Sequence, residues 1–159
     1  MSDQSVATHS GDETRQTGRL LAAQLRPGDI LLLHGDLGAG KTTFTQGLLA
    51  GLRVASPVNS PTFILVAEHH GTLPSGEPVL IRHADLYRIE DPDQLESTGY
   101  FDLIHNPEGI AVIEWPERAA AHLPDQYILV TLEFKGPQTR QITLIDNSGS
   151  NRRLVLSAR

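Results

Sequence analysis

The sequence predicts an α/β fold with a central mixed sheet flanked by helices. In the first half of the chain, apolar strand-like runs alternate with helical patterns, which is typical of parallel strands joined by crossover helices. In the last third, strand-like runs follow one another with only turns between them, as in antiparallel hairpins. We therefore expect a parallel core with antiparallel hairpins beside it.

The N-terminal part of the chain predicts a flexible segment followed by a helix. Residues 1–11 are mostly small and polar, so we expect them to be flexible and residues 12–159 to form a single domain. Residues 12–25 place leucines on one helical face, and a proline and a glycine follow directly. This pattern predicts that a helix ends near residue 25.

A strand, a glycine-rich loop and a second helix come next. The apolar run DILLLH at 29–34 is bounded by turn signals and predicts a buried strand. Residues 35–40 contain three glycines, and residues 41–52 then carry apolar side chains three and four positions apart. The three segments together predict a strand–loop–helix unit.

The middle of the chain predicts a loop, a hairpin and two short helices. Residues 56–61 contain two Ser-Pro pairs and predict a loop. Residues 63–70 and 78–87 are strand-like and are joined by a turn-rich segment, which predicts a hairpin. Residues 91–104 open with Asp-Pro-Asp, a helix-start signature, and Gly99 is expected to split them into two helical pieces.

The last part of the chain is rich in short strand-like runs. Residues 110–113 predict a buried strand, and residues 116–122 predict one or two helical turns. Three further strand-like runs cover residues 127–134, 140–145 and 153–156, with Gly, Pro, Asn and Ser turns between them.

Residues 35–42 match the phosphate-binding pattern G-x-x-x-x-G-K-[ST]. Glycines let backbone amides close around phosphate oxygens, and the following helix directs its positive end at the same anion. We expect Lys41 to reach the β- and γ-phosphates of a nucleotide and the Thr42 hydroxyl to bind Mg²⁺. The predicted phosphate-binding residues are Gly35, Asp36, Leu37, Gly38, Ala39, Gly40, Lys41 and Thr42.

Two carboxylates follow apolar strands and are candidates for the chemistry. Glu114 ends the run IAVIE, where ligands gather in open α/β sheets, and is a candidate for the second Mg²⁺ ligand. Asp85 ends the run VLIRHAD and is a candidate for orienting water or acting as a general base. The residues alone leave the alternatives open: a plain strand-end carboxylate for Glu114 and a turn-capping aspartate for Asp85.

Five blocks in order make the chain similar to a known family. They are ET with a later glycine at 13–18, GDLGAGKTT at 35–43, SPTF at 60–63, HADLYR at 83–88 and EW with ER at 114–118. With these blocks, spanning about two-thirds of the sequence, the chain resembles the TsaE (YjeE) family, bacterial P-loop ATPases of tRNA threonylcarbamoyladenosine biosynthesis.

The resemblance implies a P-loop NTPase fold and weak intrinsic ATPase activity with ATP/ADP and Mg²⁺ as ligands. It implies that Thr42 and Glu114 hold the metal and that Asp85 is catalytic beside Lys41 and Glu114. It also adds four residues expected at the nucleotide: Thr14, Thr43, Thr62 and Trp115. Another interpretation of Trp115 is an aromatic side chain packed at a strand end.

The resemblance further implies two protein partners, TsaB and TsaD, and contact with tRNA only through their complex. The formal charge of −6 agrees with this, because a direct nucleic-acid surface needs clustered cations and the chain has only two lysines, Lys41 and Lys135.

Composition excludes some classes of protein and suggests a location. The chain has no cysteine, which excludes disulfide scaffolds and thiolate chemistry. It also has no signal-like N-terminus and no apolar run long enough to span a membrane, so we expect a cytoplasmic protein without membrane contact. Two other functions remain open: a small P-loop metabolite kinase, and a nucleotide-gated binding module.

Overall fold

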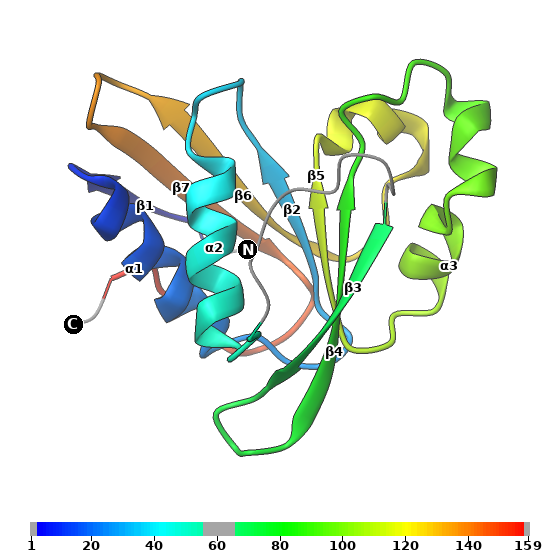
Figure 1. Ribbon diagram of the computed structural model, residues 1–159, viewed down its shortest axis with the longest axis horizontal. Coiled ribbons are helices and arrows are strands. Elements are labelled where there is room, and N and C mark those ends of the chain that lie inside the picture. Colours follow the sequence, from blue (N-terminus) through cyan, green and yellow to red (C-terminus); the bar gives the residue numbers. More distant parts are fainter. Residues whose placement is uncertain (1–2, 56–65, 158–159) are drawn as a thin grey trace.

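The computed structural model describes residues 3–55 and 66–157, and these residues contain a seven-stranded sheet (Figure 1). The strands are β1 (Asp3–Thr8), β2 (Ile30–His34), β3 (Val66–Thr72), β4 (Pro78–Asp85), β5 (Ile110–Glu114), β6 (Tyr127–Phe134) and β7 (Arg140–Asn147). The helices are α1 (Gly11–Ala22), α2 (Lys41–Gly51) and α3 (Tyr100–His105), with 3₁₀ segments η1 (Pro92–Ser97) and η2 (Pro116–His122).

The sheet is mixed, as the sequence predicts. Its strand order is β1-β7-β6-β2-β5-β4-β3. The four central strands β6, β2, β5 and β4 run parallel, while β3 pairs antiparallel with β4, and β7 pairs antiparallel with both β6 and β1. The expectation of a parallel core with antiparallel hairpins beside it is therefore confirmed.

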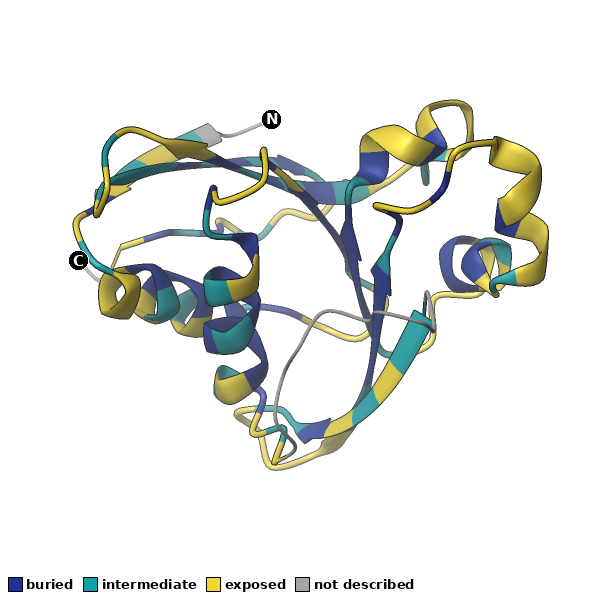
Figure 2. Ribbon diagram, turned by 45° about the horizontal axis from the view of Figure 1, so that its top comes forward, coloured by how far each residue is buried: buried dark blue, intermediate teal, exposed yellow. Residues whose placement is uncertain are grey.

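Helices cover both faces of this sheet (Figure 1). On one face, α1 and α2 bury a core cluster that includes Leu31 and Leu33 of β2 and Val112 of β5. On the other face, α3 and the 3₁₀ segments bury a second cluster that includes Leu32 and Ile113. Figure 2 shows the buried residues concentrated along the central strands and on the helix sides that face them. Helices cover both faces of β2, so its side chains are buried on both sides, and this explains its near-continuous apolar run.

Within residues 1–11, which were expected to be flexible, residues 3–8 form the strand β1. Its residues pair with β7 in continuous antiparallel register, from Asp3 opposite Ile145 to Thr8 opposite Arg140. The side chain of Gln4 donates to the carbonyl of Leu154 and accepts from the amide of Leu156. This strand depends on partners about 140 residues away, so a search for local apolar periodicity does not detect it.

The predicted strand at 153–156 is also wrong, because the structure assigns no strand there. Leu154 and Leu156 are nevertheless buried in the α1–α2 core. The Gln24 amide donates to the carbonyl of Val155 and accepts from its backbone N–H, at 2.8 Å each. Side-chain amides therefore satisfy backbone groups of this segment that a neighbouring strand would otherwise pair.

The remaining elements follow the expectation closely. Gly99, with φ of 91°, lies between η1 and α3 and separates the two helical pieces as predicted. The hairpin β3–β4 forms, although β3 is described only from Val66 onward. The predicted loop at 56–61 lies outside the described residues.

Candidate functional site

A pocket of about 360 Å³ lies at the carboxyl ends of β2, β4 and β5, beside the start of α2. Ten of its lining residues are predicted site residues: Asp36, Leu37, Gly38, Gly40, Lys41, Thr42, Thr43, Asp85, Glu114 and Trp115. The structure therefore brings together, in one cavity, side chains that lie up to 79 positions apart between Asp36 and Trp115. Ligands bind at this edge of parallel sheets, at the carboxyl ends of the strands.

The glycine-rich loop adopts a shape that needs its glycines. Gly38 and Gly40 have φ values of 79° and 101°, in the left-handed region that side chains disfavour. A Cβ on Gly35 would lie 2.6 Å from the Leu132 carbonyl oxygen of β6. The loop thus passes close to the sheet and then enters α2 at Lys41, so the positive end of the helix faces the pocket.

Lys41 is buried and held in place at the centre of the site. Its Nζ donates to the Gly35 carbonyl and lies 3.6 Å from the centroid of the Trp115 ring. Burial lowers the pKa of Lys41, while the negative charges of Glu114, Glu117, Asp85 and Asp36 act in the opposite direction. The ammonium group therefore lies among carboxylates that have no other lysine near them.

Asp85 and Glu114 are direct neighbours across β4 and β5, which are parallel and place the two residues in register. Glu114 is buried, with its side chain 3 % exposed. Burial raises the pKa of Asp85; the N–H that Tyr87 donates to its Oδ1 at 3.0 Å opposes this rise, and the charge of Glu114 adds to it. The pocket therefore contains one partly buried carboxylate beside a deeply buried one.

Replacing Asp85 by asparagine is expected to raise the free energy of unfolding at pH 7 by about 0.5–2 kcal/mol. The raised pKa means that the folded protein disfavours the charged form, which the neutral amide avoids, while the amide oxygen still accepts the Tyr87 N–H. The gain in stability should shrink as the pH falls through the folded pKa, and it should vanish below the unfolded value of about 3.9, where the wild-type carboxyl is protonated in both states.

Urea unfolding of both proteins between pH 3 and pH 7 measures this difference. Asp125→Asn is the matched control, because Asp125 is exposed and lies outside this pocket. An Asp85→Asn protein that is less stable than wild type at pH 7 would contradict the burial argument.

Trp115 also lines the pocket. Its backbone is in the left-handed region, with φ of 58° and ψ of 49°, directly after β5 and before η2. The Trp115 and Tyr87 ring centroids lie 4.9 Å apart, and the Arg118 guanidinium carbon lies 5.8 Å and 5.7 Å from these rings, respectively. These contacts fix the indole over Lys41, so that Trp115 packs at a strand end and also lines the pocket.

The other predicted residues are placed as follows. Ala39 is buried inside the loop, and Gly35 contributes its carbonyl to Lys41. Thr14 lies next to the main pocket, in a smaller cavity of about 140 Å³ that Gly40 and Thr43 also line. The Thr14 and Thr8 hydroxyls lie 2.8 Å apart in a buried hydrogen bond. Thr62 lies outside the described residues.

Three site residues were not expected from the sequence. Tyr87 lines the pocket, and Arg140 of β7 also lines it while donating to the Gly38 carbonyl of the loop at 3.1 Å. His83 of β4 lies 2.6 Å from Glu114, measured from Nε2 to Oε2. Tyr87 and His83 belong to the HADLYR block, which is a signal that could have pointed to them, whereas no local pattern marks Arg140.

The donors in the pocket suit a hard cation shared with a phosphate group. Thr42 provides a hydroxyl, and Asp85 and Glu114 provide carboxylates, which are the oxygen donors that Mg²⁺ prefers. Among residues 3–55 and 66–157, no group of three or more His, Cys, Asp or Glu side chains is arranged to hold a metal by itself. Mg²⁺ commonly binds through one or two carboxylates together with substrate phosphates, so the residues present fit this ion.

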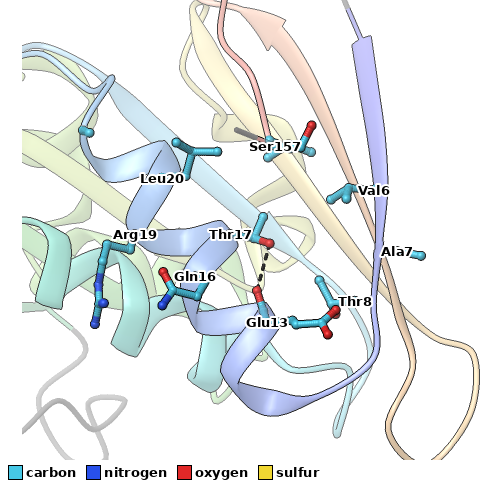
Figure 3. Close-up of a pocket in the computed structure, with 11 residues that line it drawn as sticks. Val6, Ala7, Thr8, Glu13, Gln16, Thr17, Arg19, Leu20 and Ser157 are labelled. Carbon is cyan, nitrogen blue, oxygen red and sulfur yellow. Dashed lines mark hydrogen bonds between the residues drawn. The ribbon is translucent and has the colours of Figure 1, made fainter. Parts of the chain in front are cut away.

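A larger pocket of about 520 Å³ lies elsewhere, between β1, α1 and the C-terminal segment. Figure 3 shows Val6 and Leu20 on opposite sides of it, with the Thr17 hydroxyl bonded to the Glu13 carbonyl at 3.0 Å. None of the predicted nucleotide-binding residues lines this pocket. The pocket of about 360 Å³, where the charged groups converge, is therefore the candidate active site.

Comparisons with known proteins agree on one family. The family model described as "Threonylcarbamoyl adenosine biosynthesis protein TsaE" matches residues 8–142. The tRNA threonylcarbamoyladenosine biosynthesis protein TsaE of Bacillus subtilis is 39 % identical over 137 residues, which cover 86 % of this chain and 81 % of that protein. The protein of the same name from Nostoc is 41 % identical over 134 residues, which cover 82 % of this chain and 78 % of that protein.

A solved structure is similar as well. The crystal structure of Bacillus subtilis YdiB superposes with a TM-score of 0.72 at 29 % identity, covering 92 % of this chain and 86 % of that one. In the described part of this chain, no helix is long and apolar enough to cross a bilayer. The family match spans most of the sequence and all of the described pocket, so the chain belongs to the TsaE family of tRNA threonylcarbamoyladenosine biosynthesis proteins.

Proposed function

We propose that this protein is a Mg²⁺-dependent ATPase of the cytoplasm, with a P-loop NTPase fold, that acts with TsaB and TsaD in the threonylcarbamoyladenosine modification of tRNA. One observation carries the proposal: Lys41, Thr42, Asp85 and Glu114 converge on one pocket at the carboxyl ends of parallel strands. A family role in the same biosynthesis supports the choice of pathway.

The loop and the start of α2 would bind the phosphates of ATP. Residues of the loop and of the first turn of α2 line the pocket, so their backbone N–H groups and the positive end of α2 are available to phosphates, and Lys41 is the lysine among the lining residues. To reach the β- and γ-phosphates, Lys41 exchanges its bond with the Gly35 carbonyl for bonds with phosphate oxygens. Thr42 and Glu114 would hold Mg²⁺, which supplies neutralisation of the phosphate charge that develops during transfer.

Asp85 would orient the attacking water and accept its proton. A general base works best when its pKa is close to the operating pH, and burial moves the pKa of Asp85 upward, toward that range. Tyr87 holds one oxygen of this carboxylate through its backbone N–H. The position beside Glu114 brings Asp85 to the side of the pocket where the metal and the terminal phosphate would meet.

The charge of the chain supports an indirect relation to tRNA. A formal charge of −6 does not favour binding to a polyanion, so we assign the tRNA-binding surface to TsaB and TsaD. The exposed Leu37, 70 % accessible, lines the same pocket, which fits a protein surface that covers the nucleotide.

Reconstitution with TsaB, TsaD and tRNA tests this proposal. We expect modified tRNA to accumulate over many turnovers only when this chain and ATP are both present, and free phosphate to be released at the same time. Equal modification without the chain would contradict the proposal. Full modification with a non-hydrolysable ATP analogue would favour the nucleotide-gated binding module, and a phosphorylated small-molecule acceptor would favour the metabolite kinase.

A further inference from the structure

His83 forms a buried pair with the proposed metal ligand. Its Nε2 lies 2.6 Å from Oε2 of Glu114, and the two side chains are 1 % and 3 % exposed. A carboxylate that binds a metal ion can only accept hydrogen bonds, so in the metal-binding state the imidazole Nε2 is the donor in this contact. A hydrogen bond this short to a charged acceptor is one of the stronger kinds in proteins.

The sheet explains how this contact arises. Asp85 and Glu114 are in register on β4 and β5, and His83 is paired with Val112, two residues earlier on each strand. Side chains two positions apart on a strand lie on the same face. Val112 belongs to the α1–α2 core cluster, so His83 lies beneath the two carboxylates, between the pocket and that core.

His83 itself is not a residue of the pocket. It does not line the cavity, and its Nδ1 is buried without a hydrogen-bond partner among the described residues. A leucine or phenylalanine would fill such a position without leaving a polar atom unpaired. The imidazole is therefore best explained by its contact with Glu114, because a packing role alone does not require the Nε2 donor.

We propose that His83 is a positioning residue that fixes the carboxylate of Glu114 in the orientation that binds Mg²⁺. This inference rests on the proposed function, since it concerns the metal of the same site. By occupying Oε2, the imidazole restricts rotation of the carboxylate, and it offsets the cost of keeping a charge that is almost fully buried. Residues that hold metal ligands in this way commonly change metal affinity by about 10–100-fold when they are replaced.

The test measures coupling between metal and nucleotide rather than turnover alone. Calorimetry gives the Kd of ADP in EDTA and in saturating Mg²⁺, and the ratio of the two values reports how much Mg²⁺ strengthens ADP binding. For His83→Phe, which keeps the ring volume and removes the donor, we expect this ratio to fall at least about 10-fold. The Kd of ADP in EDTA should stay within about twofold, because the phosphate-binding loop is unchanged.

Two further variants separate positioning from packing. His83→Gln can still donate to Oε2 and should keep the ratio within about threefold of wild type. His69→Phe is the matched control: His69 lies on β3 opposite Ile81, on the same face of the sheet, and makes no hydrogen bond to Glu114. Thermal unfolding without nucleotide or metal checks each fold, and if His83→Phe does not fold, His83→Asn, whose amide is too short to reach Oε2, takes its place with the same expected loss.

The outcomes distinguish the two levels of the proposal. A wild-type protein that binds no ADP, or binds it equally well with and without Mg²⁺, overturns the proposed function and this inference with it. A wild-type protein with strong Mg²⁺ coupling and a His83→Phe protein with the same coupling overturn the positioning role alone. A drop in ADP affinity that is equal in EDTA and in Mg²⁺ also overturns it, because that result indicates a structural role only.

Discussion

Lys41→Ala is expected to lower ATP hydrolysis by at least about 10³-fold and to abolish support of tRNA modification. The ammonium is the cation that the pocket offers from α2, and Asp36, Asp85 and Glu114 surround it. Without it, three carboxylates would face the phosphates of ATP with no lysine between them. We therefore expect weaker ATP binding and slower hydrolysis. Phosphate release by the purified protein measures the combined loss.

The fold should survive this substitution. Burial disfavours the charged form of Lys41, so removal of the ammonium takes away an unfavourable desolvation as well as its contacts with Gly35 and Trp115. The chain provides a matched control in its other lysine, Lys135, which is half exposed and 3.3 Å from Glu133. Lys135→Ala should hydrolyse ATP at the wild-type rate; hydrolysis by Lys41→Ala within tenfold of wild type would contradict the assigned role.

The parts of the site that the sequence predicts are those that depend on local patterns. The strand β2, the glycine loop and the helix α2 are continuous in sequence, and each has its own signal. Asp85 and Glu114 could be expected to be close because both follow apolar runs, and the carboxyl ends of parallel strands meet at one edge. Only the structure establishes that β4 and β5 are direct neighbours.

The parts that were missed depend on which strands lie side by side. The contact of His83 with Glu114 requires both the neighbouring position and the register of β4 and β5. Arg140 reaches Gly38 from more than one hundred positions away, because β7 lies beside β6 at the same end of the sheet. β1 forms because β7 offers an edge for pairing, and its mostly polar sequence DQSVAT gives no helical or core-strand periodicity.

Gly47→Ala is expected to lower the free energy of unfolding by about 1–3 kcal/mol, although alanine is the better helix former by about 1 kcal/mol. Gly47 lies on α2 against α1, and a Cβ there would lie 2.0 Å from the Arg15 carbonyl oxygen. The reciprocal contact exists at Gly18 of α1, where a Cβ would lie 2.3 Å from the Phe44 carbonyl. Since both obstacles are helix backbone, the methyl group fits only if the helices separate.

The direction of the change in unfolding free energy shows whether helix propensity or the packing of α1 on α2 decides the stability of Gly47→Ala. Gly11→Ala is the matched control, because Gly11 is also helical and a Cβ there would make ordinary contacts only with side-chain atoms, Arg15 at 3.5 Å and Thr43 Cγ2 at 3.9 Å. Chemical denaturation should show unchanged or higher stability for Gly11→Ala and lower stability for Gly47→Ala. Separation of the helices would also shift the start of α2, so the affinity for ADP should fall in Gly47→Ala together with its stability. If Gly47→Ala proved more stable than wild type, the close packing of α1 on α2 would be contradicted, because helix propensity alone would then decide the outcome.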